Sequence, residues 1–151
     1  MRDSAALDNE VRLQILREIL ARGSAPSAAA TAAALRLPQS EIETSYDRLA
    51  TNRVIVLRPG TRDVLMAAPL SAVPTPHVVR VTDGRSHYGN CVWDALGLLA
   101  MLGSDGVVDT SCADCASPLQ LSVRNGEIEP SDAVVHFAVP AARWWQDIVF
   151  T

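Results

Sequence analysis

The segment YGNCVWDALGLLAMLG, residues 88–103, predicts a strongly apolar helix that runs from about Asn90 to Leu102. Strand-like runs surround this helix, at 77–81 before it and at 107–108, 119–123 and 134–139 after it. One helix among several strands is typical of the α+β class. We therefore expect residues 77–151 to form a small mixed β-sheet domain with a central apolar helix.

The rest of this second half shows shorter features. Asn125-Gly126 predicts a hairpin turn, and residues 140–147 predict a short helix. Residues 148–151 look like a strand that has barely begun. We therefore expect the domain to be cut short at its carboxyl end, and exchange of this terminal segment between the two copies of a homodimer is an open alternative.

Three helices and a hairpin are predicted upstream. Apolar residues spaced three or four apart predict a helix at 7–20, and Ser27 suits the N-cap of a short Ala-rich helix at 28–35. A third helix runs from Ser40 to near Asn52, and strand-like runs at 54–57 and 64–67 then flank a turn. This order is that of a winged-helix module. We expect residues 1–68 to form a winged-helix-like helical module, residues 69–76 a Pro-rich extended linker, and residues 77–151 the α+β domain.

Charge argues against a nucleic-acid partner for the front module. Its third helix region carries two arginines, Arg48 and Arg53, against the acids Glu41, Glu43 and Asp47. A helix that contacts phosphates normally presents a basic face. A module that serves packing is therefore the favoured interpretation, and the net charge of −4 for the 151 residues agrees with it.

Composition and cysteine count bound the location. The chain is 48% apolar and 20% charged, enough for a real core, but no apolar run approaches the roughly 20 residues that a membrane span requires. The amino terminus lacks the pattern of a secretory signal, so we expect a cytoplasmic protein without a membrane partner. Three cysteines, an odd number in such a compartment, indicate free thiols rather than a disulfide framework.

Cys91 and Asp94 form the first candidate site. If Asn90 is the N-cap, Cys91 falls in the first helical turn, where free amide groups lower the pKa of a thiol. Asp94 follows three residues later on the same helix face. A thiolate beside a carboxyl group that carries a proton can bind a soft metal and protonate its leaving group. The alternative is a small buried cysteine and a first-turn acid that merely supports the helix.

Cys112-Ala113-Asp114-Cys115 forms the second candidate site, a C-x-x-C between two strands. A complete zinc site would need a second such pair, and the sequence has none. The motif is open to several interpretations: a metal half-site shared with Cys91, a thiol pair that passes on a soft metal, a zinc-binding pair, a redox couple, or a plain turn with two small residues. Cys91, Cys112 and Cys115 are thus the candidate metal ligands.

Aromatic and histidine residues look less informative. Trp144 and Trp145 are expected in the core or an interface rather than around a ligand. His77, His87 and His136 are scattered along the chain, and His136 is expected to point outward from a strand.

Three segments together resemble a known family, the alkylmercury (organomercurial) lyases: residues 88–103, TSCADCASPLQLSV at 110–123 and VHFAVPAARWWQDIVF at 135–150. The similarity covers nearly the whole chain. In that family a Cys and an Asp in the C-x-x-D arrangement act together with a second Cys on a later strand. Cys91 and Asp94 match the first two positions, which implies that they are the catalytic residues.

The resemblance implies an enzyme, a carbon–mercury lyase that needs no cofactor. Thiolates take up the mercury of a small organomercurial, an acid protonates the bound carbon, and Hg(II) stays on sulfur as the bound product. Low-molecular-weight thiols are the expected second partner. Cys91 would be the first mercury ligand and Asp94 the final proton donor.

The family's second catalytic cysteine should fall at Thr151, the last residue of the sequence, or immediately after it. Cys112 matches a family cysteine outside the catalytic pair, and Cys115 is an addition to the pattern. If no further cysteine follows, Cys112 or Cys115 would have to serve as the second thiol. The competing function is a non-catalytic, regulatory protein on the same fold that binds a metal or a small ligand through its three thiols.

Overall fold

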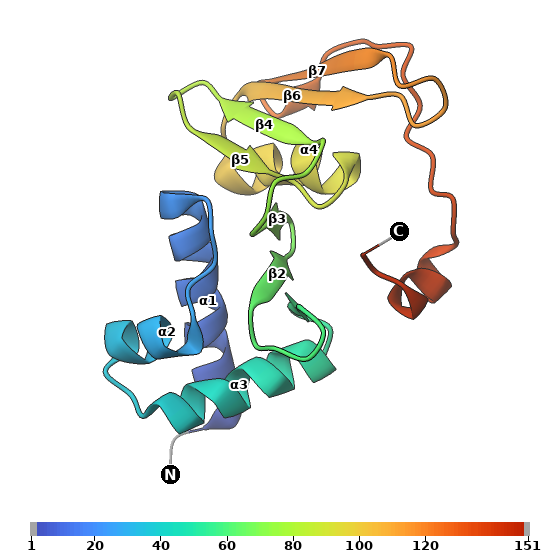
Figure 1. The fold of residues 1–151 in the computed structure, drawn as a ribbon. Helices are drawn as coiled ribbons and strands as arrows, with labels where there is room; N and C mark the ends of the chain where they lie inside the picture. The colour runs from blue at the N-terminus through green and yellow to red at the C-terminus, as the bar shows by residue number, and fades with distance from the viewer. Residues whose placement is uncertain (1–2, 150–151) are drawn as a thin grey trace.

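The computed structural model describes residues 3–149 and has the expected α+β architecture (Figure 1). Three helices and a small three-stranded sheet form the front half, and a five-stranded sheet with one helix forms the second half. The elements in chain order are α1 (Ser4–Arg22), α2 (Ala28–Leu35), α3 (Gln39–Thr51), β1 (Val56–Leu57), β2 (Val64–Ala67), β3 (Leu70–Ser71), β4 (Val78–Val81), β5 (Ser86–Tyr88), α4 (Val92–Leu102), β6 (Gly106–Ser111), β7 (Pro118–Arg124), β8 (Glu127–Ile128) and the 3₁₀ helix η1 (Ala141–Gln146).

Local signals set the ends of the front helices. The backbone N–H of Ala30 donates to the Ser27 hydroxyl, so Ser27 caps α2 as predicted. Gly23, with a φ of 74°, ends α1 in the left-handed conformation that glycine adopts at low cost.

The polar side chains of the front half are largely satisfied within it. The hydroxyl of the fully buried Tyr46 donates to the carbonyl of Pro26 and lies 2.8 Å from the Thr31 hydroxyl. Arg48 makes a bidentate ion pair with Asp8 of α1, at 2.9 and 2.6 Å. Arg48 is therefore engaged inside the protein.

The second half is a single antiparallel sheet of order β5-β4-β6-β7-β8. Every pair of neighbouring strands among residues 3–149 is antiparallel, so the expected mixed sheet is corrected. Short turns join β4 to β5, β6 to β7 and β7 to β8, which favours antiparallel pairing because a parallel pair needs a long crossover; the connection from β5 to β6 runs through α4. Helix α4 packs against this sheet; a Cβ atom at Gly106 of β6 would lie 2.6 Å from Leu99 of α4, so the two elements meet closely there.

The expected linker contains a strand. Leu70 and Ser71 form β3, which pairs with β2, and Leu70 is fully buried. Leu70 also forms an isolated antiparallel bridge with Gly89, just ahead of α4. The stretch 69–76 is thus not a free linker throughout, because Leu70 and Ser71 pair with β2 and its apolar side chains are buried between the two halves. The division into 1–68 and 77–151 stays a proposal.

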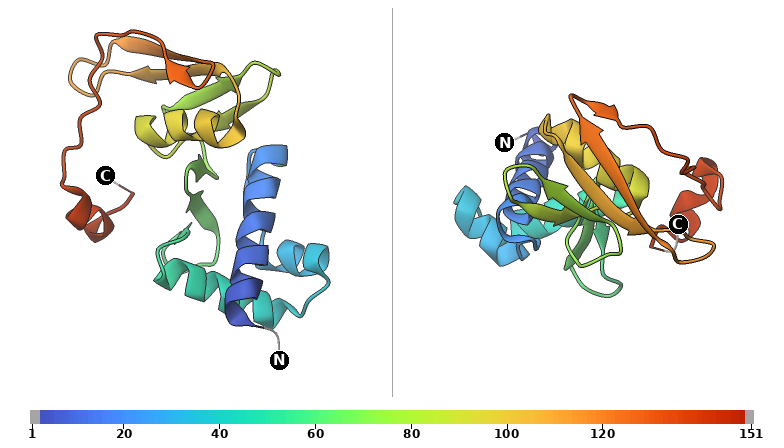
Figure 2. Two further views of the ribbon diagram at one scale, coloured as in Figure 1. Left: turned by 180° about the vertical axis from the view of Figure 1, so that it is seen from behind. Right: turned by 90° about the horizontal axis from the view of Figure 1, so that it is seen from above.

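The carboxyl-terminal segment departs from the prediction. No strand forms at 134–139; the chain leaves the sheet and returns alongside the front half, as Figures 1 and 2 show. Aromatic packing competes with sheet pairing there, because Phe137 packs on two tryptophans and the Trp144 indole donates to the Val139 carbonyl at 2.7 Å. His136 is exposed on this irregular segment rather than on a strand. The expected strand 148–151 is a turn at 148–149, and Phe150 and Thr151 lie outside the described residues.

No helix in the described part of the chain is both long enough and apolar enough to cross a membrane.

Candidate active site

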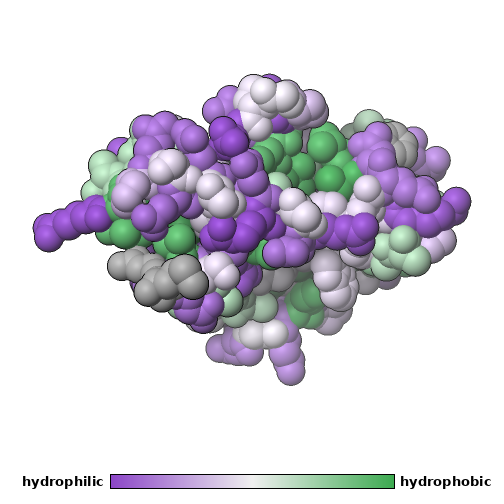
Figure 3. Space-filling view, turned by 90° about the horizontal axis from the view of Figure 1, so that it is seen from below, coloured by the Kyte–Doolittle hydropathy of each residue, from purple (hydrophilic) through white to green (hydrophobic). Residues whose placement is uncertain are grey.

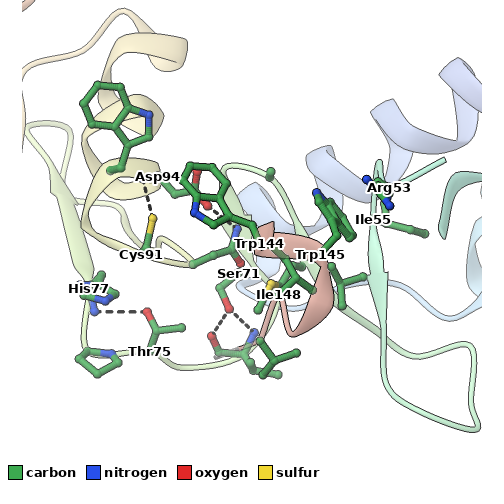
Figure 4. Close-up of a pocket in the computed structure, with 18 of the residues that line it drawn as sticks. Arg53, Ile55, Ser71, Thr75, His77, Cys91, Asp94, Trp144, Trp145 and Ile148 are labelled. Atoms are coloured by element: carbon green, nitrogen blue, oxygen red, sulfur yellow. Dashed lines mark hydrogen bonds between the residues drawn. The ribbon is translucent and has the colours of Figure 1, made fainter. Parts of the chain in front are cut away.

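A cavity of about 500 Å³ lies where the two halves and the carboxyl-terminal segment meet. Its walls come from the first hairpin, from residues 73–77, from the start of α4, and from residues 137–149. Figure 4 shows Cys91, Asp94 and His77 on one side and Trp145 and Ile148 toward the other. In the view from below, hydrophobic side chains gather in a hollow of the surface (Figure 3). The site therefore combines a few polar groups with a mainly apolar wall, as small-molecule sites usually do.

Cys91, rather than Asn90, is the N-cap of α4. Its backbone is extended, with φ −141° and ψ 178°, and the Asp94 backbone N–H donates to the Cys91 sulfur at 3.4 Å. The side-chain amide of Asn90 instead donates to the Asp94 carboxylate at 2.8 Å. The prediction of Asn90 as the cap is therefore wrong by one residue, and its amide orients the acid instead.

Burial dominates the chemistry of the Cys91 thiol. Burial raises its pKa above the ordinary value, and so does the charge of Asp94, while the amide N–H of Asp94 acts in the opposite direction. The expected lowering of the thiol pKa is thus corrected: the helix N-terminus contributes as predicted, but loss of water outweighs it. The resting site favours the protonated thiol.

Asp94 is the acid of the site. Burial raises the pKa of its carboxyl group, and the Asn90 amide and the charge of His77 partly oppose that rise. A carboxyl group with a raised pKa holds its proton closer to neutral pH. The structure thus places a carboxyl group with a raised proton affinity three residues from a thiol, with both groups lining the same cavity.

His77 lines the same cavity, although the sequence made the histidines look scattered. Its Nδ1 atom lies 2.8 Å from the Thr110 hydroxyl, and burial lowers the pKa of its ring, which favours the neutral form. The Asp83-Gly84 turn is the sequence signal that could have placed His77 near this site. β4 and β5 pair around that turn, which brings residue 77 opposite Gly89, and the Gly89 N–H donates to the His77 carbonyl.

Aromatic residues line the cavity, contrary to the expectation of a core or interface role. The rings of Trp93 and Phe137 meet edge to face with centroids 6.2 Å apart, and Phe137 and Trp144 are 5.1 Å apart. Trp145 lies under the Arg53 guanidinium, whose central carbon is 5.5 Å from the ring centroid. Arg53 thereby connects the front half to the carboxyl-terminal segment.

Cys112 and Cys115 lie on the turn between β6 and β7 and do not line the cavity. All three cysteines are free. Within residues 3–149, no group of three or more His, Cys, Asp or Glu side chains is placed to hold a metal ion. The structure therefore brings Cys91 and Asp94 together and leaves the other two thiols at a separate place.

Comparison with known proteins gives the following matches. Residues 70–151 match the family model described as MerB, alkylmercury lyase. Two curated relatives, the alkylmercury lyases of Bacillus cereus and Clostridium butyricum, are each 35% identical to the chain over 74 residues. That match covers 47% of this chain and 34% of each relative, so the chain spans about a third of the length of these relatives.

A solved structure also matches, the mercury-bound form of MerB2. It has a TM-score of 0.64 and 21% sequence identity, and the match covers 82% of this chain and 60% of that one. At this identity the likeness shows a shared α+β fold.

Proposed function

Because the chain belongs to the alkylmercury lyase family, we propose that it cleaves the carbon–mercury bond of small organomercurials by protonolysis in the cavity around Cys91. One observation carries the proposal: a thiol and a carboxyl group, joined through the capping hydrogen bond from the Asp94 amide to the Cys91 sulfur, line an apolar cavity. These are the two groups that protonolysis of a metal–carbon bond requires, a soft ligand and an acid.

The proposed reaction has two steps. Cys91 first loses its thiol proton and forms a sulfur–mercury bond with R–Hg⁺, and Asp94, as carboxylate, takes that proton. Asp94 then returns the proton to the carbon bound to mercury, the carbon–mercury bond breaks, and R–H leaves while Hg(II) stays on sulfur. No electrons are gained or lost overall, so the reaction needs neither an oxidant nor a cofactor.

The raised pKa values of Cys91 and Asp94 support this order of events. A thiol that is protonated at rest carries into the site the proton that the carbon later receives. A carboxylate whose charged form is disfavoured by burial takes up the thiol proton more readily than an exposed one, so Asp94 can hold that proton beside the carbon bound to mercury. The aromatic wall formed by Trp93, Phe137 and Trp144 would receive the organic group.

A second thiolate completes the proposal. Of the three cysteines, Cys91 is the one that lines the cavity. We propose that the second thiolate comes from a cysteine after Thr151, as the family resemblance implies, or from a low-molecular-weight thiol that also carries Hg(II) away. A reducing cytoplasm, where free thiols persist, is the proposed location.

The direct test is to incubate the full chain with phenylmercuric acetate and excess thiol and to measure benzene by gas chromatography. Release of benzene by the wild type and its loss in Cys91→Ser would support the proposal. Cys112→Ser is the matched control and should retain activity, because its thiol lies outside the cavity. In D₂O the product should carry one deuterium.

Equal benzene release by the wild type and Cys91→Ser would overturn the proposal. Binding of the organomercurial at Cys91 with no benzene released would favour the competing function, a protein that holds the metal without turning it over.

A further inference from the structure

The turn between β6 and β7 is tightly closed. The Cys112 N–H donates to the Ser117 carbonyl at 2.9 Å, and the Ala116 N–H donates back to the Cys112 carbonyl at 2.9 Å. Ala116 holds a positive φ of 58°, so the chain reverses sharply after Cys115. The two cysteines of the motif therefore sit at the two sides of one short, hydrogen-bonded loop.

The side chain of Cys112 lies within hydrogen-bonding reach of the Cys115 thiol. The Cys115 sulfur is 3.1 Å from the Ser117 hydroxyl. Hydrogen bonds from the side chain and backbone of Ser117, and then from the Cys112 side chain, lower the pKa of the Cys115 thiol. Cys115 is exposed and Cys112 half-buried, so a solute can reach the pair from solvent.

We propose that Cys112 and Cys115 form a second binding site. This surface dithiol chelates a soft cation that binds stably with two thiolate ligands, such as Hg(II). Binding forms two sulfur–metal bonds and releases the two thiol protons, with no change of oxidation state. Two thiolates neutralise the charge of a divalent cation, so the exposed loop gains no net charge.

The ligand count selects the class of cation. Zinc prefers four tetrahedral ligands, and no third His, Cys, Asp or Glu in the part of the chain that the structure describes joins this pair. Thiolate ligands favour soft metals over hard ones. A soft, two-coordinate ion is therefore the better match, and zinc would bind weakly here.

The identity of the cation as Hg(II) rests on the proposed function, because that reaction leaves Hg(II) on Cys91. The surface dithiol would then hold the product outside the cavity and keep it from blocking Cys91. The chelating pair itself depends only on the loop geometry, so it can be tested without any turnover.

The test uses mercuric chloride, which contains no carbon–mercury bond. The Cys91→Ser variant of the 151-residue chain, whose remaining cysteines are Cys112 and Cys115, is titrated under anaerobic conditions in excess monothiol, and bound mercury is measured after gel filtration. We expect one Hg(II) per chain. Adding Cys112→Ser or Cys115→Ser should each lower the apparent affinity at least tenfold. Ser117→Ala, which keeps both thiols, is the matched control and should still bind one ion.

Two outcomes would overturn the inference: no mercury retained by Cys91→Ser, or equal retention after removal of either loop thiol. Zinc bound as tightly as mercury would also contradict it. Alkylation of the wild type with iodoacetamide, mapped by mass spectrometry with and without mercuric chloride, needs no variant; Cys112 and Cys115 should be protected together. If the loop does not bind mercury, benzene release by the wild type is unaffected. If the proposed function is wrong, mercury binding by the loop is unaffected.

Discussion

The backbone N–H of Asp94 donates to the sulfur of Cys91 at 3.4 Å, so the residue that carries the proposed acid is also tied to the proposed mercury ligand through the cap of α4. Capping and chemistry thus use the same sulfur atom. Substitutions at Cys91 and Asp94 can separate capping from chemistry, because a variant can lose activity while its stability is kept or raised.

Cys91→Ser should keep the fold and lose the activity. A serine hydroxyl is a good N-cap acceptor, so α4 keeps its first hydrogen bond, but it is a poor ligand for a soft metal. Cys91→Ala, which removes the cap, should lie about 0.5–2 kcal/mol below Cys91→Ser in free energy of unfolding. Urea denaturation followed by circular dichroism measures this, and equal stability of the two variants would argue against the capping role.

Asp94→Asn should lower the rate of benzene release by about 10²–10⁴-fold, the usual contribution of a general acid. The amide still accepts from Asn90, so the local geometry is preserved. Single-turnover kinetics of wild type and variant at one pH check this, and a rate within a factor of three of wild type would exclude Asp94 as the proton donor.

The difference in stability between Asp94→Asn and the wild type should change with pH. Burial raises the folded-state pKa of Asp94 above its ordinary value of 3.8. The wild type is therefore most stable below pH 3.8, where the Asp94 carboxyl group is neutral, and it loses this stability as the pH rises through the folded-state pKa of Asp94. The variant should be more stable than wild type at pH 7, and this advantage should vanish near pH 3 (~1 unit below the ordinary value). Urea melts across this range measure the difference, and a constant gap would contradict the prediction.

Gly89→Ala, between β5 and α4, should displace the start of α4, which carries Cys91 and Asp94. A Cβ atom there would lie 2.6 Å from the backbone nitrogen of Ala95 and 2.8 Å from its Cβ, so α4 would have to move. Overpacking of this kind typically costs about 1–3 kcal/mol. Gly97→Ala is the matched control: it lies on the exposed face of α4 with no atom within 4 Å of an added Cβ, and it should stabilise by up to about 1 kcal/mol.

Arg53→Ala should loosen the carboxyl-terminal segment. The cation–π contact with Trp145 is worth about 0.5–1 kcal/mol at an exposed site, so global stability should fall only slightly. Hydrogen exchange of the peptide around η1 should become faster, while exchange in β6 and β7 stays the same. Arg143→Ala, on η1 itself, serves as the control, and equal exchange in both variants would exclude the Arg53 contact as the cause.

Local signals predicted much of the fold, because caps and periodicity act over a few residues. Ser27 caps its helix as expected, and the pairing of Cys91 with Asp94 follows from helical spacing alone. The N-cap was misplaced because Asn90 is the better cap by residue preference, whereas the structure uses its amide to hold the Asp94 carboxylate.

The remaining features depend on contacts between distant residues. The direction of the Cys91 pKa shift is set by burial beneath packed side chains, which no local pattern encodes. The apolar, valine-rich run at 134–139 is typical of a strand, yet Phe137 finds its partners in Trp93 and Trp144 rather than across a sheet. His77 reaches the cavity because β4 and β5 pair, and the spacing of the histidines along the sequence does not reveal that pairing.

The far wall of the cavity comes from residues 53–56 and Met66, which precede the segment 70–151 that matches the family. Reactive groups and the opposite wall are thus encoded in different parts of the gene. Substitutions in the front half can reshape the chamber while the thiol and the acid stay untouched. Under the proposed function, substitutions in the front half would change which organic groups fit the chamber and leave the reacting groups as they are.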